Sequence, residues 1–378
     1  MQLPKNQQEW ILFSLFCSFA FFAALQVWYY LWFFSRLAFH KNKQGPISTP
    51  PASVLICARN EATNLEENLP LIMTQDYPDF EVVVINDCSW DDTELVLKNL
   101  AGRYPNLKII TIKQDDSFSH GKKVAVMVGI KGAKHEHLLF TDADCKPQSD
   151  QWLRQMMKPF DQDCDIVLGY GAYQKESGFL NRLIRFDTFT IALMFLSMAM
   201  ARRPYMGVGR NLAYKRTLFF KNKGFASHYY IASGDDDLFI NEAATRDNTV
   251  SVIAPEGFTL SVPKRSLRDW VRQKGRHATT FSHYKMGTRL RLLLFGLSQY
   301  LFYLLFLPLV VLWYEPIIVL SIFGFKQLVQ LIIFSRSMEK LKEKDLLWLF
   351  PFLEFSLMCL YPVISINNRF SKNNKWKT

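Results

Sequence analysis

The chain has 378 residues, of which 49% are hydrophobic, and it carries a formal net charge of +11 at pH 7. Nucleic-acid binding is disfavoured despite that charge, because the sequence contains no zinc-finger, helix-turn-helix or RNA-binding signature. Its six cysteines form no C-x-x-C pair and no metal-ligand spacing, which indicates a reducing compartment rather than a disulfide-rich secreted protein.

The first predicted element is a transmembrane helix near the N-terminus. Residues 10–34 read WILFSLFCSFAFFAALQVWYYLWFF, an uncharged run longer than the roughly 20 residues that cross a bilayer. No small-residue cleavage site follows, so a signal peptide is disfavoured. The basic residues Arg36, Lys41 and Lys43 come next and place the following region in the cytoplasm. We therefore predict an N-terminal membrane anchor over residues 1–40.

Residues 50–289 alternate between predicted strands and helices. The strand segments are ASVLICA, FEVVVIND, LKIITI and EHLLFTDAD, and the segments between them show helical spacing of apolar residues. Such β-α repeats predict an α/β fold with a mostly parallel sheet and helices on its faces. Ligands collect at the carboxyl ends of the strands in such folds.

Polar clusters stand at three of these strand ends, namely ARNE, NDCSWDDT and TDADC. In the last of them, Asp142 and Asp144 are one residue apart. Alone, the pair would be consistent with a solvated turn. Beside a second acidic strand end, it predicts a site for Mg²⁺ or Mn²⁺, which bind through one or two carboxylates and substrate phosphates.

With these clusters, residues 50–290 resemble the membrane-embedded glycosyltransferases of family 2, which have the GT-A fold and include the cellulose, chitin and hyaluronan synthases. The resemblance implies a nucleotide-sugar donor, with UDP favoured as the nucleotide. It implies that Asp87 reads the uracil ring, that Asp142 and Asp144 hold the metal, and that Asp144 is the direct ligand. The remaining nucleotide contacts that it implies are Ala58, Arg59, Glu61 and one lysine of HGKKVAV, Lys122 or Lys123, of which we select Lys123.

Two further stretches extend the resemblance. GVGRNLAYKR (207–216) is similar to a glycine-rich segment beside the donor and acceptor sugars, which implies contacts from Gly209, Arg210 and Asn211. SGDDDLFIN (233–241) is similar to the acidic catalytic motif, whose second acidic residue, here Asp236, is the base, with Asp235 beside the sugars. Without the resemblance, three adjacent carboxylates are more simply read as a solvated turn.

Residues 267–285 form an amphipathic segment that predicts an interfacial helix. Its QKGRH resembles the family's Q-x-x-R-W motif, which implies that Arg276 meets the diphosphate and that Gln273 and His277 lie beside the sugars. His277 stands where the family has Trp and offers less stacking area. That departure favours transfer of a single sugar over processive synthesis.

Further apolar segments follow later in the chain. Residues 179–201 fit either a helix against the bilayer or a buried domain helix. Segments 292–313 and 316–334 predict a tight transmembrane hairpin, whose basic loop at 335–345 lies in the cytoplasm. Segment 346–365, which prolines interrupt, either crosses the membrane or enters it and returns to the same side. Residues 290–366 are therefore expected to contain two to three transmembrane spans. The basic tail, 367–378, prefers the cytoplasm, which conflicts with a further crossing.

Together these features predict an inverting, metal-dependent glycosyltransferase at the cytoplasmic face of the cell membrane. The expected donor is a nucleotide-sugar, and the acceptor is a lipid, a lipid-linked group or a polysaccharide. Lysines and arginines beside the spans predict contact with anionic membrane lipids. The alternatives are a processive polysaccharide synthase, a metal-dependent nucleotidyl- or phosphotransferase, and a non-catalytic membrane scaffold.

Overall fold

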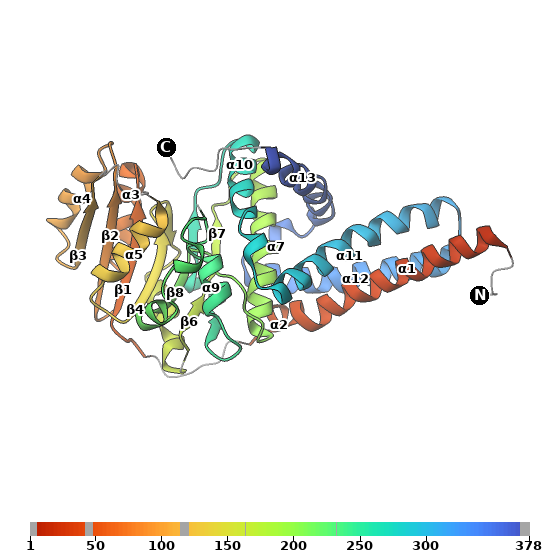
Figure 1. The fold of residues 1–378 in the computed structure, drawn as a ribbon, viewed down its shortest axis with the longest axis horizontal. Coiled ribbons are helices and arrows are strands. Elements are labelled where there is room, and N and C mark those ends of the chain that lie inside the picture. The colour runs from red at the N-terminus through yellow and green to blue at the C-terminus, as the bar shows by residue number, and fades with distance from the viewer. Residues whose placement is uncertain (1–5, 42–47, 114–120, 163, 232, 371–378) are drawn as a thin grey trace.

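A computed structural model describes residues 6–41, 48–113, 121–162, 164–231 and 233–370. Two parts are visible in Figure 1, an α/β domain and a bundle of long helices that extends away from it. The basic tail from residue 371 onward lies outside the described residues.

The first half of the α/β domain follows the predicted strand and helix alternation. Its strands are β1 (Ala52–Ala58), β2 (Phe80–Asp87), β3 (Leu107–Ile112) and β4 (His137–Asp142), and its connecting helices are α3 (Ala62–Met73), α4 (Thr93–Ala101) and α5 (Lys122–Gly132). The four strands pair in parallel. β1 and β2 are near-continuous apolar runs, as expected where helices cover both faces of a parallel sheet.

The second half of the domain completes the sheet with short strands that the sequence did not reveal. The main sheet has the order β3-β2-β1-β4-β8-β6-β9, and β8 is antiparallel to both β4 and β6. A small sheet has the order β5-β10-β7. The short strands are β5 (Cys145–Pro147), β6 (Ile166–Leu168), β7 (Gly171–Tyr173), β8 (Leu212–Lys215), β9 (Thr249–Ser251) and β10 (Thr259–Ser261). The prediction of a mostly parallel α/β sheet is confirmed.

Five further helices complete the α/β domain: α6 (Trp152–Met157), α7 (Phe179–Met200), α8 (Arg216–Lys221), α9 (Asp237–Ala243) and α10 (Leu267–Ala278). α7 is long and apolar enough to cross a membrane, but 83% of its apolar window is buried inside the protein. Of the two interpretations of residues 179–201, the structure therefore supports the buried domain helix.

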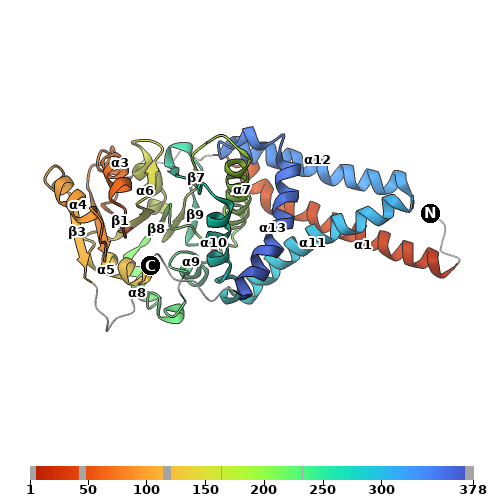
Figure 2. The ribbon, with the colours of Figure 1, turned by 90° about the horizontal axis from the view of Figure 1, so that it is seen from above.

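Three long apolar helices run side by side in the bundle (Figures 1 and 2). They are α1 (Gln7–Tyr29), which continues through a π-helical turn (Tyr30–Phe34) into α2 (Ser35–Ala38), α11 (Met286–Val311) and α12 (Pro316–Lys340). Each is long and apolar enough to span a membrane. The ammonium group of Lys340 donates to the carbonyl of His40 at 2.7 Å, so the basic ends of α2 and α12 lie together.

The last helix, α13 (Phe350–Phe370), differs from these three. Its apolar part, Phe350–Ile366, is shorter than the other candidate spans, and Figure 2 shows it crossing the bundle at a steep angle. Leu353 and Leu357 on one face are buried, whereas Phe352 and Phe355 are 71% and 67% exposed. This pattern is that of a helix lying along an apolar surface.

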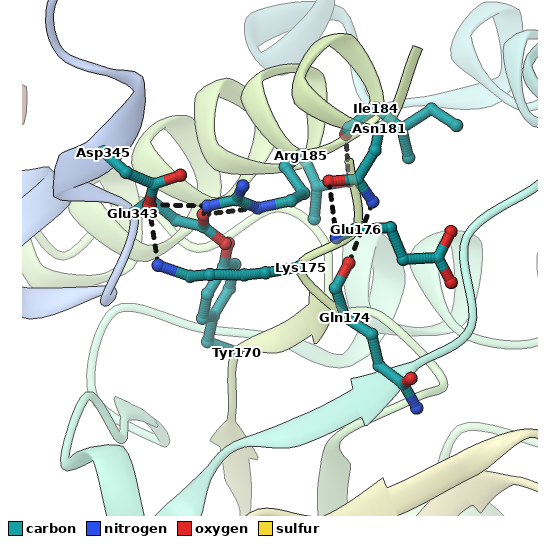
Figure 3. A network of polar contacts seen from close by, with 10 residues as sticks. Tyr170, Gln174, Lys175, Glu176, Asn181, Ile184, Arg185, Glu343 and Asp345 are labelled. Atoms are coloured by element: carbon teal, nitrogen blue, oxygen red, sulfur yellow. Dashed lines mark hydrogen bonds and ion pairs between the residues drawn. The ribbon is translucent and has the colours of Figure 1, made fainter. Parts of the chain in front are cut away.

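An ion-pair network with a buried Arg185–Glu343 pair joins α7 to the segment that follows α12 (Figure 3). The Arg185 guanidinium donates to Glu343 Oε2 and to Asp345 Oδ1 at 2.7 Å. Lys175 pairs with the same Asp345 oxygen at 2.6 Å, and the Tyr170 hydroxyl donates to Glu343 Oε1 at 3.2 Å. Because Arg185 and Glu343 are each 2% exposed, the pair fixes the α/β domain on the helical bundle.

Candidate active site

The loops that follow β1 and β2 are tied together at the edge of the sheet. The backbone N–H of Trp90 donates to Asn60 Oδ1 at 3.0 Å, and Asn60 has a left-handed φ of 56°, a conformation that Asn tolerates well. The Arg59 guanidinium lies 5.6 Å from the centre of the Trp90 ring. Asp87 ends β2, and Glu61 directly precedes α3. The structure thus brings Arg59, Glu61 and Asp87 to one edge of the sheet.

Asp142 and Asp144 lie at the end of β4 beside a half-buried cation. Lys122, the first residue of α5, places its ammonium group 2.9 Å from Asp142 Oδ1 and 3.2 Å from Asp235 Oδ2. Burial would lower the pKa of Lys122, but the three carboxylates of Asp142, Asp235 and Asp236 outweigh it and hold that pKa well above its usual value. Burial would likewise raise the pKa of Asp142, but the charge and hydrogen bond of Lys122 outweigh burial, so the pKa of Asp142 lies below its usual value.

Asp144 differs from its neighbour in charge environment. Burial and the adjacent Asp142 carboxylate raise the pKa of Asp144, while Arg210 works in the other direction. The oxygens of Asp142 and Asp144 converge with the Cys145 sulfur within 4.8 Å of one another. A cation between the two carboxylates would relieve the repulsion that raises the Asp144 pKa.

The three consecutive aspartates before and within α9 have distinct surroundings. Asp237 is 8% exposed and accepts hydrogen bonds from Thr280 at 2.5 Å and from Tyr284 at 2.7 Å, so it holds the fold together. Asp235 pairs with Lys122. Asp236 is not engaged by a cation within salt-bridge distance in the described part of the chain, and only backbone N–H groups donate to it.

Asp236 has the properties of a base that works near neutral pH. Its Oδ2 accepts from the N–H of Gly209 at 2.7 Å and its Oδ1 from the N–H of Asp237 at 2.7 Å. Burial, Asp235 and Asp237 raise the pKa of Asp236 to about 7, against the opposing effect of Lys122. A general base functions best when its pKa lies near the working pH.

Gly209 and Arg210 form the wall between Asp236 and the small sheet. A Cβ atom at Gly209 would lie 3.3 Å from Asp236 Oδ2, so a side chain there would crowd the carboxylate. The Arg210 guanidinium stacks on Tyr173, 4.4 Å from the ring centre, and donates to Ser261 Oγ at 3.4 Å. The structure therefore keeps both predicted residues at the site.

Helix α10 closes the site from the other side. The Gln273 amide donates to the Tyr173 hydroxyl at 3.5 Å. Desolvation in the cleft, followed by the charges of Lys274 and Arg276, lowers the pKa of His277. His277 also interacts electrostatically with Asp142. The last turn of α10 consequently borders the acid pair.

Residues 53–223 match the family model described as Glycosyl transferase family 2. The chain carries a family 2 glycosyltransferase domain. Among its relatives, glycosyltransferase AglE of Haloferax volcanii is 31% identical over 144 residues, 37% of this chain and 45% of AglE. The poly-beta-1,6-N-acetyl-D-glucosamine synthase of Staphylococcus epidermidis is 28% identical over 115 residues, 29% of this chain and 25% of the synthase. The chain thus matches less than half the length of either relative.

A solved structure supports the fold of the glycosyltransferase domain and extends the alignment to most of the chain. Mannosyltransferase PcManGT from Pyrobaculum calidifontis, in complex with GDP-Man and Mn²⁺, aligns with a TM-score of 0.56 over 88% of this chain and 99% of its own. Its sequence identity is 18%, so the likeness concerns the fold alone. The GT-A fold that the resemblance implied is confirmed.

Lys123, a predicted nucleotide contact of the glycosyltransferase domain, has partners inside the protein. Lys123 is 5% exposed, and its ammonium group donates to the carbonyls of His228 at 2.5 Å and Ile231 at 2.8 Å, so backbone carbonyls already hold it and its contact with a nucleotide stays a prediction. Lys122, the other lysine of the same motif, points into the site. Adjacent residues on a helix project about 100° apart, and the sequence does not show which of the two faces inward.

Asn211, which was expected beside the sugars, likewise has its partners inside the protein. Its side chain is 0% exposed. The amide donates to the carbonyls of Tyr170 at 3.0 Å and Gly257 at 2.8 Å, and its oxygen accepts from the Trp152 indole at 3.0 Å. These three bonds use both polar atoms of the Asn211 side chain, so its contact with a sugar stays a prediction.

Other residues of the site were not singled out from the sequence. Tyr173 and Ser261 lie at the ends of β7 and β10, three-residue strands without a clear pattern, and they hold Arg210. Ala58, which was predicted, is fully buried at the end of β1, and its contact with a nucleotide stays a prediction.

The donor set at the end of β4 suits a hard divalent cation. Two carboxylates, one from Asp142 and one from Asp144, offer the oxygen ligands that Mg²⁺ and Mn²⁺ prefer. The third group, Cys145, contacts Ser261 Oγ at 2.9 Å, and burial raises its pKa well above the usual value, so it remains a thiol and not a thiolate ligand. The residues present therefore fit the expected ion.

Proposed function

We propose that this protein is an inverting, metal-dependent glycosyltransferase that acts at the cytoplasmic face of a membrane. The donor is a nucleotide-diphosphate sugar, with UDP as the favoured nucleotide. The acceptor is a lipid, a lipid-linked group or a polysaccharide. One observation carries the proposal: Lys122 lies within 3.2 Å of carboxylates from both Asp142 and Asp235, so the acid pair and the acidic motif share one cleft.

The chemistry assigns a task to each side of that cleft. Asp236 takes the proton of the acceptor hydroxyl as its oxygen forms a bond to the anomeric carbon of the donor, and the bond from that carbon to the diphosphate breaks. A single displacement of this kind inverts the anomeric centre. A base held within hydrogen-bond reach typically contributes 10² to 10⁴ in rate, in order of magnitude, roughly 3 to 5 kcal/mol.

The departing diphosphate needs positive charge where its negative charge develops. Lys122 and Arg210 line this side, and Arg276 on α10 is the third cation proposed to face the diphosphate. A divalent cation on Asp142 and Asp144 would add charge stabilisation to the leaving group. Arg59, Glu61 and Asp87, at the edge of the sheet, would hold the nucleotide.

Three bundle helices and α13 support a position of the site next to a membrane. α1, α11 and α12 each satisfy the length and hydropathy expected of a span, and Lys340 lies at the bundle end next to the α/β domain. Basic residues prefer the cytoplasmic side, which supports a cytoplasmic catalytic domain. The few spans support transfer of one sugar rather than export of a growing chain.

A panel of sugar nucleotides tests the proposal. Membranes containing the protein should release nucleotide from one donor in the presence of Mn²⁺ or Mg²⁺, and a chelator should abolish that release. Release that depends on added lipid extract would identify a lipid acceptor, and release without lipid but with glycan would favour a polysaccharide. No metal-dependent release from any donor would refute the proposed activity.

A further inference from the structure

A buried carboxylate on α7 connects two helices that approach it from different parts of the chain. Asp187 is 0% exposed. Its Oδ2 forms an ion pair with the ammonium group of Lys274 on α10, and its Oδ1 accepts a hydrogen bond from the hydroxyl of Tyr361 on α13. Figures 1 and 2 both show α7, α10 and α13 next to one another.

The ion pair lies on the face of α10 that packs against the protein. Trp270, one turn before Lys274, is 1% exposed, and the Lys274 ammonium lies 6.0 Å from its ring centre. The side chain of Lys274 is 13% exposed. Leaving either charge of such a pair without its partner is strongly unfavourable, so the pair specifies one position of α10 on α7.

The same short helix carries the groups that close the active site. Gln273 directly precedes Lys274 and contacts Tyr173, the residue on which Arg210 stacks. His277 lies less than one turn further on, near enough to Asp142 for a charged imidazole to lower the pKa of that carboxyl. A rotation or slide of α10 would therefore move its cleft-facing groups relative to the acid pair.

We propose that Lys274 and Asp187 are a positioning pair that holds α10 in the orientation required at the active site, and that Tyr361 links this pair to α13. The exposed side chains Phe352 and Phe355 of α13 are suited to a lipid surface. The position of α10 is thus coupled to α13, the helix suited to a lipid surface. The kinetic part of this inference rests on the proposed function, and the structural part does not.

Kinetics of the full-length protein in lipid nanodiscs test the positioning role. Lys274→Met should raise the donor KM and lower kcat/KM by about 10- to 100-fold, since small misplacements far from the reacting atoms have effects of this size. Lys274→Arg keeps the charge and should restore most of the activity. Lys98→Met, which removes an exposed lysine paired with Glu94, is the matched control and should leave both constants unchanged.

A double-variant cycle separates positioning from direct substrate contact. Asp187→Asn alone should reproduce the defect of Lys274→Met, and the combined variant should be no worse than the more affected single variant. If Lys274 instead touched the substrate, Asp187→Asn would leave the donor KM at the parent value. Tyr361→Phe, which removes only a hydroxyl, should give a weaker defect in the same direction.

Hydrogen exchange measured by mass spectrometry tests the structural part without catalysis. Lys274→Met should accelerate amide exchange over residues 267–278, and peptides from β1 and β2 should remain as protected as in the parent. Parent-like exchange in α10 together with a parent-like KM, even at a lower unfolding temperature, would overturn the inference. An inactive parent protein would refute the proposed function. The exchange result would still decide whether Lys274 and Asp187 hold α10 in place.

Discussion

The ammonium group of Lys122 lies 2.9 Å from Oδ1 of Asp142. This contact joins the start of α5 to the end of β4, and the same ammonium group also pairs with Asp235 before α9. Three separate parts of the chain thus converge on one cation. Lys123, the adjacent residue, instead donates to two backbone carbonyls inside the domain.

The two lysines should therefore respond differently to the same substitution. Lys122→Met removes a cation from the cleft and should lower kcat by about 10²-fold, the size typical of losing one electrostatic stabiliser. Lys123→Met removes the donor to the carbonyls of His228 and Ile231, so it should lower the unfolding temperature and spare kcat of the folded protein. Steady-state kinetics and thermal unfolding of both variants check this contrast. A normal kcat in Lys122→Met would contradict it.

Asp144→Ala should weaken metal-dependent binding of the donor. Asp142 already has Lys122 as a partner. Burial and the Asp142 charge raise the pKa of Asp144, and a bound cation would offset this effect on the Asp144 carboxylate. Calorimetric titration with nucleotide diphosphate, with and without Mn²⁺, should show that Mn²⁺ strengthens binding to the parent protein but not to the variant. Asp247→Ala, at a 71% exposed carboxylate, is the control and should bind as the parent does.

Activity should fall on the acid side of neutrality. Because the pKa of Asp236 is raised to about 7, the base becomes protonated as the pH drops through that value, and kcat/KM should decrease about tenfold for each further pH unit. A pH–rate profile measures this. The effect of pH on stability has the opposite sign. The Asp236 carboxyl binds its proton more tightly in the folded state than in the unfolded state, so its contribution to the free energy of unfolding increases as the pH falls below 7. A rate that stays constant between pH 5 and 8 would exclude Asp236 as the base.

Asn211→Ala should destabilise the protein rather than alter sugar recognition. The substitution leaves the Trp152 indole and the carbonyls of Tyr170 and Gly257 without this partner, and unsatisfied buried groups of this kind cost about 1 to 3 kcal/mol each. Thermal unfolding should show a clear decrease. Asn222→Ala, which removes one bond to the carbonyl of Leu218, should have a smaller effect. A stable Asn211→Ala protein with a weakened sugar affinity would restore the original expectation.

The sequence predicts the first half of the domain well because its signals are long and regular. β1 is expected from ASVLICA and is observed as Ala52–Ala58, and β2 and β3 likewise occupy the predicted segments. The strands β5 to β10 have only three or four residues each, too few for a period to be visible. The partners of Arg210, which lie in β7 and β10, were missed for this reason.

Side-chain direction limited the prediction of the site. Asp142 and Asp144 could be selected because a strand end fixes where they project, and the structure brings them together. Lys122 and Lys123 are equivalent in sequence, and only the packing of α5 against the sheet distinguishes them. Asn211 belongs to a polar stretch, but its partners Trp152 and Gly257 are distant in sequence, so its burial could not be foreseen.

The most direct test of the central claim compares the parent protein with Asp236→Asn in two assays. The first measures Mn²⁺-dependent binding of the nucleotide, and the second measures transfer of the sugar in a single turnover. The variant keeps the Asp142/Asp144 pair and Lys122, so it should bind the nucleotide as the parent does while transfer falls by about 10² to 10⁴. Parent-like transfer by Asp236→Asn, or full transfer by the parent in excess chelator, would contradict a mechanism that joins one base to one metal-assisted leaving group.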